Sequence, residues 1–155
     1  MADAVPLASR FLSALPHLQR AWRREADAAL AGHMLSASTA LPLVTLGRLG
    51  QGLRQVELAD ALAIDEASLS PVLTQLSGAG LVERRADASD RRARTLYLTA
   101  SGMALARQAE AALAGVRERL LGGVAEADLT AALRVFHAME TAARRGAPPT
   151  ARDAA

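Results

Sequence analysis

The sequence contains no cysteine and no lysine, and only 3% of its 155 residues are aromatic. The missing cysteine excludes disulfide frameworks, thiolate metal sites and cysteine-based redox sensing. No apolar run approaches the ~20 residues of a membrane-spanning helix, and no basic-then-apolar leader opens the chain. We therefore expect a soluble, cytoplasmic protein.

The sequence also lacks recognisable catalytic motifs. His17, His33 and His137 are isolated from one another, and no two of them have metal-ligand spacing such as i, i+4. There is no nucleophile elbow, no glycine-rich phosphate loop and no paired-carboxylate site. We therefore expect that the protein is not an enzyme and has neither a cofactor nor a metal site.

What the sequence does contain favours helices. Apolar residues, mostly Ala, Leu and Val, make up 51% of the chain, and Ala and Leu propagate helices well. The length suits one compact domain, residues 1–155. All 18 basic residues are Arg, and the net charge of +2 is too small to indicate nucleic-acid binding by itself. The distribution of charge along the chain is more informative.

Apolar residues at helical spacing predict helices on both sides of the centre. One stripe predicts a helix from Arg10 to Met34, with Pro16 marking a kink or a fresh start. Ser36 or Ser38 can cap a second helix running to Leu49. In that helix, Pro42 is tolerated because it falls near the first turn.

The C-terminal half predicts two further helices. Thr99 is a good N-cap for a long helix that two glycines, 122 and 123, end. A last helix runs roughly from Glu126 to Arg145, and the tail, residues 146–155, has the composition of a disordered segment.

The central region predicts a winged helix-turn-helix. A short helix from Arg54 to Leu62 and a tight turn lead to a second helix that ends near Gly78 or Gly80. The segments "LVERR" and "RTLYL" have strand character on either side of the polar "ADASD", which predicts a β-hairpin. The expected fold is mainly α with a small β-hairpin wing. A DNA-binding lobe, residues 36–98, is flanked by dimerisation helices, residues 7–34 and 100–145, whose wide apolar faces favour a homodimer.

The second helix of this unit, "EASLSPVLTQL", contains a proline, Pro71. If the helix began directly after Asp65, this proline would be its sixth residue and would forfeit a hydrogen bond, at a cost of ~3 kcal/mol. With Ser68 or Ser70 as the N-cap, it falls at N3 or N1, where no intrahelical donor is needed. We therefore expect the recognition helix to begin at Ser68–Ser70, with the preceding "DEA" forming a separate turn.

These motifs together resemble the MarR family of bacterial transcription regulators. The resemblance covers roughly Leu35 to Leu113, and "GLVERRADASDRRARTLYLTASG" is its most specific piece. It implies a dimer whose first and last two helices form the interface, and two winged helices that read a palindromic operator. Members of the family usually repress transcription. Many release DNA when a small aromatic or phenolic compound binds between the dimer arms and the DNA-binding lobe.

The hairpin concentrates positive charge. Residues 84–94 hold five arginines, at positions 84, 85, 91, 92 and 94, against Asp87 and Asp90. A projecting cation of this kind can lie across phosphates or enter the minor groove, and an ordinary solvated turn is the alternative. We expect DNA contacts from Arg84, Arg91, Arg92 and Arg94. By resemblance, Arg91 or Arg92 is the wing-tip residue, while Asp90 is structural and pairs with Arg84 or Arg92.

The helix-turn-helix itself is acidic. Residues 55–82 hold four acidic residues and no basic one, so attraction to DNA must come from the wing, Arg54 and Arg48. Four side chains are left to contact bases or phosphates: Ser68, Ser70, Thr74 and Gln75. The sequence is equally compatible with an N-cap role for Ser68 or Ser70 and with a position on the solvated surface for Thr74 and Gln75. A winged helix used for protein contact, with weak or no DNA binding, is the alternative function.

Candidate effector residues surround the only tryptophan. Trp22 has Arg23 and Arg24 beside it, and core or dimer packing is the alternative role for its ring. The resemblance places four further residues near the same cleft: His33, Met34, Thr45 and Arg48. An arginine beside an aromatic ring would suit a carboxylated aromatic effector. The function expected is thus a repressor released from its operator by a small aromatic compound.

Overall fold

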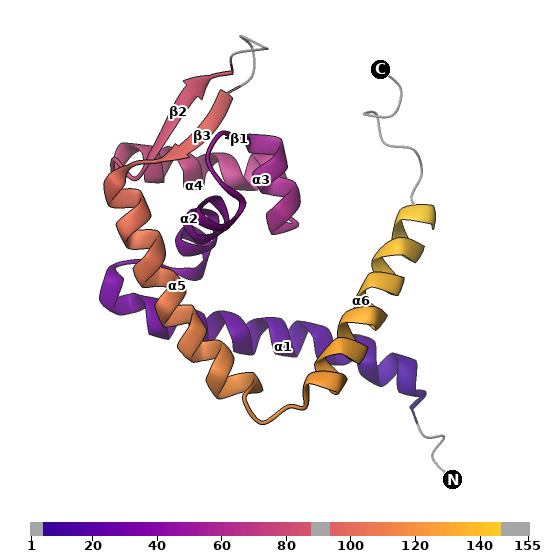
Figure 1. Ribbon diagram of the computed structural model, residues 1–155. Coiled ribbons are helices and arrows are strands. Elements are labelled where there is room, and N and C mark those ends of the chain that lie inside the picture. Colours follow the sequence, from indigo (N-terminus) through magenta and orange to yellow (C-terminus); the bar gives the residue numbers. More distant parts are fainter. Residues whose placement is uncertain (1–4, 88–93, 147–155) are drawn as a thin grey trace. The chain divides into compact units, whose positions relative to one another are not determined.

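The computed structural model describes residues 5–87 and 94–146, and these residues are mostly helical with one small sheet (Figure 1). The helices are α1 (Leu7–Leu30), α2 (Ala37–Leu49), α3 (Gln55–Leu62), α4 (Glu66–Gly78), α5 (Ala100–Leu121) and α6 (Glu126–Gly146), with a short 3-10 turn, Ala31–His33, after α1. The strands are β1 (Leu53–Arg54), β2 (Val82–Ala86) and β3 (Arg94–Leu98). The predicted winged-helix fold is confirmed. The chain divides into two compact units, Met1–Arg117 and Glu118–Ala155, and everything below except α6 and the last residues of α5 lies in the first.

The sheet is the predicted wing with one additional strand. Strand β3 lies between β1 and β2 and pairs antiparallel with both. The hairpin register matches Val82 with Leu98 and Ala86 with Arg94. Strand β1 was not predicted, because two residues are too few to show an alternating pattern. The expected tip residues Asp90, Arg91 and Arg92 lie outside the described residues, as does most of the expected C-terminal tail.

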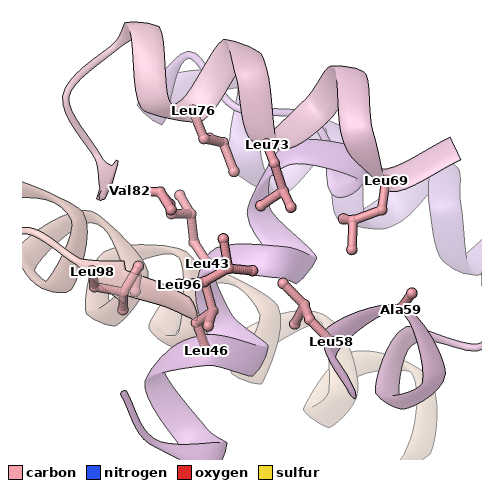
Figure 2. Close-up of a cluster of buried hydrophobic side chains, with 11 residues drawn as sticks. Leu43, Leu46, Leu58, Ala59, Leu69, Leu73, Leu76, Val82, Leu96 and Leu98 are labelled. Carbon is pink, nitrogen blue, oxygen red and sulfur yellow. The ribbon is translucent and has the colours of Figure 1, made fainter. Parts of the chain in front are cut away.

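The larger hydrophobic cluster lies beneath α4. Figure 2 shows Leu69, Leu73 and Leu76 on one side of this helix, facing leucines from α2, α3 and the sheet. The cluster comprises Leu43, Leu46, Leu58, Ala59, Leu69, Leu73, Leu76, Val82, Leu96, Leu98 and Ala106. It joins the helix-turn-helix, the wing and the first half of α5 into one packed body.

A second cluster lies on the other side of α2. It comprises Ala26, Leu30, Ala37, Ala40, Val44, Ala109 and Leu113, which come from α1, α2 and α5. Trp22 is half-buried and packs against it. Helix α2 therefore contributes to both clusters and connects them.

The expected start of the recognition helix was wrong. Helix α4 begins at Glu66, directly after Asp65, and its first turn is closed by the Leu69 N–H, which donates to the Asp65 carbonyl at 3.1 Å. Pro71 is the sixth residue of this helix and cannot donate to the Ala67 carbonyl. Both of these residues are exposed, so water can reach the unpaired carbonyl.

The packing of α4 explains why the helix nonetheless begins early. Leu69, Leu73 and Leu76 are almost completely buried, and their spacing places them on one face only if the helix is continuous from its first turn. Burying each leucine contributes about 1.5–3 kcal/mol, which together exceeds the ~3 kcal/mol lost at an interior proline. Tertiary packing therefore decides the helix start.

The expectations about the other helical prolines also need correction. Helix α1 begins at Leu7, the first residue of the expected segment 7–34, three residues before the apolar stripe that starts at Arg10; Pro16 lies inside the helix rather than at a fresh start. Pro42 is buried as the sixth residue of α2, beyond the first turn. The predicted cap of α2 is confirmed, because Ser36 occupies the N-cap and its N–H donates to the Thr39 hydroxyl at 3.0 Å.

The junction between the sheet and α5 is fixed by a small set of hydrogen bonds. The Gly102 N–H donates to the Thr99 hydroxyl at 3.0 Å, which confirms Thr99 as the N-cap. The hydroxyls of Thr99 and Ser101 donate to the Gly80 carbonyl at 2.7 and 3.1 Å. Gly102 packs directly against the Leu81 carbonyl, so that a Cβ there would collide with backbone. The start of α5 is thereby joined to the turn between α4 and β2.

Among the described residues, no single helix is both long and apolar enough to span a membrane. Helix α1 with its 3-10 turn and helix α2 reach the length and hydropathy of a membrane span only when they are taken together, and the two are bent by 81° relative to each other. Much of α2 lies in the two hydrophobic clusters.

Two glycines in neighbouring helices give a matched test of this packing. Gly102→Ala should lower the free energy of unfolding by about 1–3 kcal/mol, because the methyl group meets the Leu81 carbonyl. Gly47→Ala should raise it by up to about 1 kcal/mol, since its Cβ meets only side chains at 3.8 Å and alanine favours helix. Urea unfolding followed by circular dichroism measures both. Equal effects of the two substitutions would contradict the close packing at Gly102.

Candidate DNA-binding interface and ligand cavity

The outer side of α4 carries the polar residues expected to contact DNA. Ser68, Thr74 and Gln75 are exposed and Ser70 is half-buried. Neither serine caps the helix, because α4 begins before both of them. The Thr74 hydroxyl donates to the Ser70 carbonyl at 3.0 Å, and the Arg84 Nη2 lies 3.5 Å from the same hydroxyl. The structure therefore brings the recognition helix and strand β2 together at one exposed surface.

The arginines of the hairpin strands differ in their surroundings. Arg84 and Arg94 are exposed. Arg85 points to the other face of β2, where its guanidinium lies 4.2 Å from the centre of the Tyr97 ring and pairs with Glu83 at 2.7 Å. Arg85 is thus engaged within the sheet, whereas Arg84 lies beside α4.

Arg54 is tied to the base of the wing. Its Nε donates to the Asp87 Oδ2 at 2.9 Å, and the Asp87 side chain is only 12% exposed against 41% for Arg54. The Arg54 N–H donates to the Glu57 carboxylate at 2.6 Å, where Arg54 stands as the N-cap of α3. In the sequence, Asp87 is recognisable only as a charge that offsets the wing arginines. The structure shows that it joins the wing to the start of the helix-turn-helix.

A cavity of about 350 Å³ lies between α2 and α5. Its lining combines apolar side chains with charged ones at one edge: Val44, Gly47, Arg48, Gln51, Leu98, Met103, Ala106, Arg107 and Glu110. Gln51 also accepts a hydrogen bond from the Leu98 N–H at 2.7 Å. Of the predicted effector residues, Arg48 is the one in this lining.

Glu110 joins two arginines at the edge of this cavity. Arg48 Nη2 donates to both Glu110 oxygens at 2.6 and 2.7 Å, and Arg117 Nη2 donates to Oε1 at 2.6 Å. Burial alone would raise the pKa of Glu110, but the hydrogen bonds from the two arginines outweigh it and lower that pKa. A lowered pKa means that the pairing contributes to stability at neutral pH and that this contribution is lost as the pH falls through the folded-state pKa.

The other predicted effector residues do not share this cavity. Arg23 lines a second, smaller cavity of about 200 Å³ whose other lining residues come from α2, from the end of α3 and the turn after it, and from α4. Trp22 packs against the second cluster. His33 and Thr45 are half-buried, on the 3-10 turn and on α2. No sequence pattern indicated Gln51, Arg107 or Glu110, because the cavity joins residues that are distant along the chain.

No group of three or more metal-ligating side chains occurs among residues 5–87 and 94–146.

Comparison with known proteins identifies the family. A MarR family model matches residues 35–93. The crystal structure of the transcriptional regulator PA3341 is 32% identical, with a TM-score of 0.78, and covers 87% of this chain and 98% of that one. The Mycobacterium tuberculosis MarR family protein Rv2887, in complex with salicylic acid, is 29% identical, with a TM-score of 0.63, and covers 90% and 99%. S. aureus MepR, in complex with DNA, shares the fold at 21% identity and a TM-score of 0.76, covering 90% and 99%. The chain therefore belongs to the MarR family of DNA-binding transcription regulators.

Proposed function

We propose that this regulator is a homodimeric repressor that binds a palindromic operator and leaves it when a small aromatic effector, a carboxylated one by preference, binds. The observation that carries the proposal is the exposed surface where Arg84 of the wing meets Thr74 of α4. A cationic hairpin beside a polar helix face offers the phosphate and base contacts that operator binding needs.

The charge distribution indicates different roles for the wing and for helix α4. Helix α4 and its surroundings are acidic, so the recognition helix adds little attraction for phosphates. The affinity is assigned to the wing residues Arg84, Arg91, Arg92 and Arg94, and each phosphate neutralised adds about 0.9 to the slope of log affinity against log salt. Base discrimination is assigned to the neutral side chains of α4, chiefly Thr74 and Gln75, since amides and hydroxyls can bond to base edges.

The homodimer is supported by apolar side chains that the single chain leaves exposed. The stripe of α1 includes Leu7, 79% exposed, and Leu18, 61% exposed, while Leu133 of α6 is 66% exposed. Apolar surface of this kind is usually covered by a partner, and identical chains pair by the same surface on both. A dimer would also present two wings to a palindrome.

The effector part of the proposal is supported by the relative crystallised with salicylic acid, which is 29% identical to this chain. An aromatic acid of that class needs a cation beside an apolar wall. The α2–α5 cavity has both, with Arg48 and Arg107 beside Leu98 and Met103.

The wing is tested by Arg91→Ala combined with Arg92→Ala. We expect operator affinity to fall by about a hundredfold or more and the salt slope to fall by roughly 1.8 per subunit, since two phosphate contacts are lost on each wing. Gel-shift titrations at several salt concentrations measure both quantities on the chain's own upstream DNA. The paired substitution Arg144→Ala with Arg145→Ala removes the same charge at the end of α6 and should change affinity far less. Retained binding by the wing variant would favour the protein-interaction alternative.

Asp87→Asn tests the tie between the wing and α3. Removing a negative charge near phosphates should strengthen DNA binding by charge alone. We expect the opposite, a loss of about tenfold in operator affinity, because Arg54 no longer holds the wing base. Glu83→Gln, in the same strand pair but exposed, is the matched control and should bind as tightly as wild type or more so. The loss should disappear in an Arg54→Ala background, as a double-mutant cycle requires.

The dimer is tested with neighbouring residues of α1. Leu18→Glu should shift the chain to monomer in sedimentation at micromolar concentration, because a charge cannot be buried in an apolar interface. Gln19→Glu adds the same charge at the adjacent exposed position and should leave the dimer intact. Wild-type unfolding should also shift to higher temperature with increasing protein concentration. A monomeric wild type would refute the dimer.

A further inference from the structure

We propose that Glu110 competes for Arg48 with the small organic anion that the proposed function assigns to the α2–α5 cavity. The inference deepens the proposed function, on which it rests, by naming the contact that the effector exchanges. It assigns roles to Arg107 and Glu110, neither of which the sequence indicated.

The shape and lining of the cavity define the body of the ligand. Val44, Leu98, Met103 and Ala106 supply an apolar wall, and Gly47 leaves room between the two helices. A volume of about 350 Å³ is at the small end of the range for ligand pockets. It therefore suits a compound of one ring rather than a large cofactor.

The charges at the edge define the head group of the ligand. Glu110 pairs with Arg48 and Arg117, and Arg107 lines the same cavity, which leaves a surplus of positive charge. Arg107 makes no ion pair with any residue in the described part of the chain. A planar carboxylate matches the fork of an arginine. The edge of the cavity is thus built for an anion, and Glu110 already occupies part of that site.

Exchange of partners at Arg48 leaves no charge unpaired. Glu110 accepts hydrogen bonds from Arg48 and from Arg117. If a ligand carboxylate takes Arg48, Glu110 keeps Arg117, so the large penalty of an isolated charge does not arise. Arg48 and Glu110 are both partly exposed, which allows a ligand to approach them from solvent.

The exchanged contact lies where it can affect DNA binding. Arg48 is in the last turn of α2 and Glu110 is on α5, so their ion pair fixes the end of α2 against α5. Gln51, also in the cavity lining, bonds to the Leu98 N–H of β3. A ligand in this cavity therefore displaces the link between α2 and α5 and touches the link between β3 and the connection that follows α2.

Calorimetric titration of the full-length protein with salicylate tests the competition. Glu110→Gln should bind salicylate about tenfold more tightly than wild type, because the internal carboxylate no longer competes. Affinity for neutral salicylamide should not change. Glu118→Gln removes the same charge from the same helix two turns later and should leave salicylate affinity within about twofold of wild type, since screening weakens a charge at that distance.

Two further variants test the place of binding. Gly47→Leu should abolish salicylate binding by filling the cavity, whereas Gly47→Ala should retain it. Arg107→Gln should weaken binding about tenfold, as expected for loss of one charge-assisted contact. The inference is overturned if Glu110→Gln binds no more tightly than wild type, if Gly47→Leu binds normally, or if neither wild type nor Glu110→Gln binds salicylate at millimolar concentration.

Gel shifts separate this inference from the proposed function. If aromatic acids release wild type and Gly47→Leu from the operator equally well, the effector function stands and the cavity is not its site. If no aromatic acid releases wild type although calorimetry confirms the competition, the cavity binds anions and the effector function fails. Release of wild type but not of Gly47→Leu supports both.

Discussion

The burial of α2 on two sides is the constraint on which the rest of the DNA-binding unit depends. Leu43 and Leu46 point into the cluster under α4, while Ala40 and Val44 belong to the cluster shared with α1 and α5. A helix buried on both sides cannot shift without disturbing both clusters, because close-packed interiors tolerate only small displacements. The recognition helix, the wing and the start of α5 therefore take their positions from α2.

Local sequence signals predicted the parts of the fold whose causes are local. The hairpin strands, the caps Ser36 and Thr99 and the final helix needed only periodicity and capping chemistry. The predicted start of α4 was wrong because it followed from a local rule for proline, whereas the burial of three leucines determines where the helix begins. Strand β1 was missed because it exists only through its pairing with β3.

The candidate site was less predictable for a related reason. Its ion pairs join residues that lie far apart in the sequence, Arg54 with Asp87 and Arg48 with Glu110. In a chain with 16 acidic residues, nothing local indicates which carboxylate a given arginine will meet. The exposed polar face of α4 and the arginines of the wing could be read directly, because charge and periodicity mark an exposed surface. The cavity could not, since it forms only when α2 and α5 pack together.

The two ion pairs, Arg48 with Glu110 and Arg54 with Asp87, lie at the two ends of one short segment of the chain. Arg48 ends α2 and Arg54 begins α3, and the short connection contains Gly50 and Gly52, both at positive φ. Gly52 is held by its N–H, which donates to the Leu96 carbonyl at 2.9 Å. One end of this connection is thus fastened to α5 and the other to the wing. In the proposed mechanism, a ligand that takes Arg48 from Glu110 removes the ion pair between this connection and α5, while the apolar packing of α2 on α5 stays in place. The fixed points that remain are Gln51 and Gly52 on β3 and Arg54 on Asp87. All three join the connection to the wing, so the change is passed to the surface proposed to contact the operator.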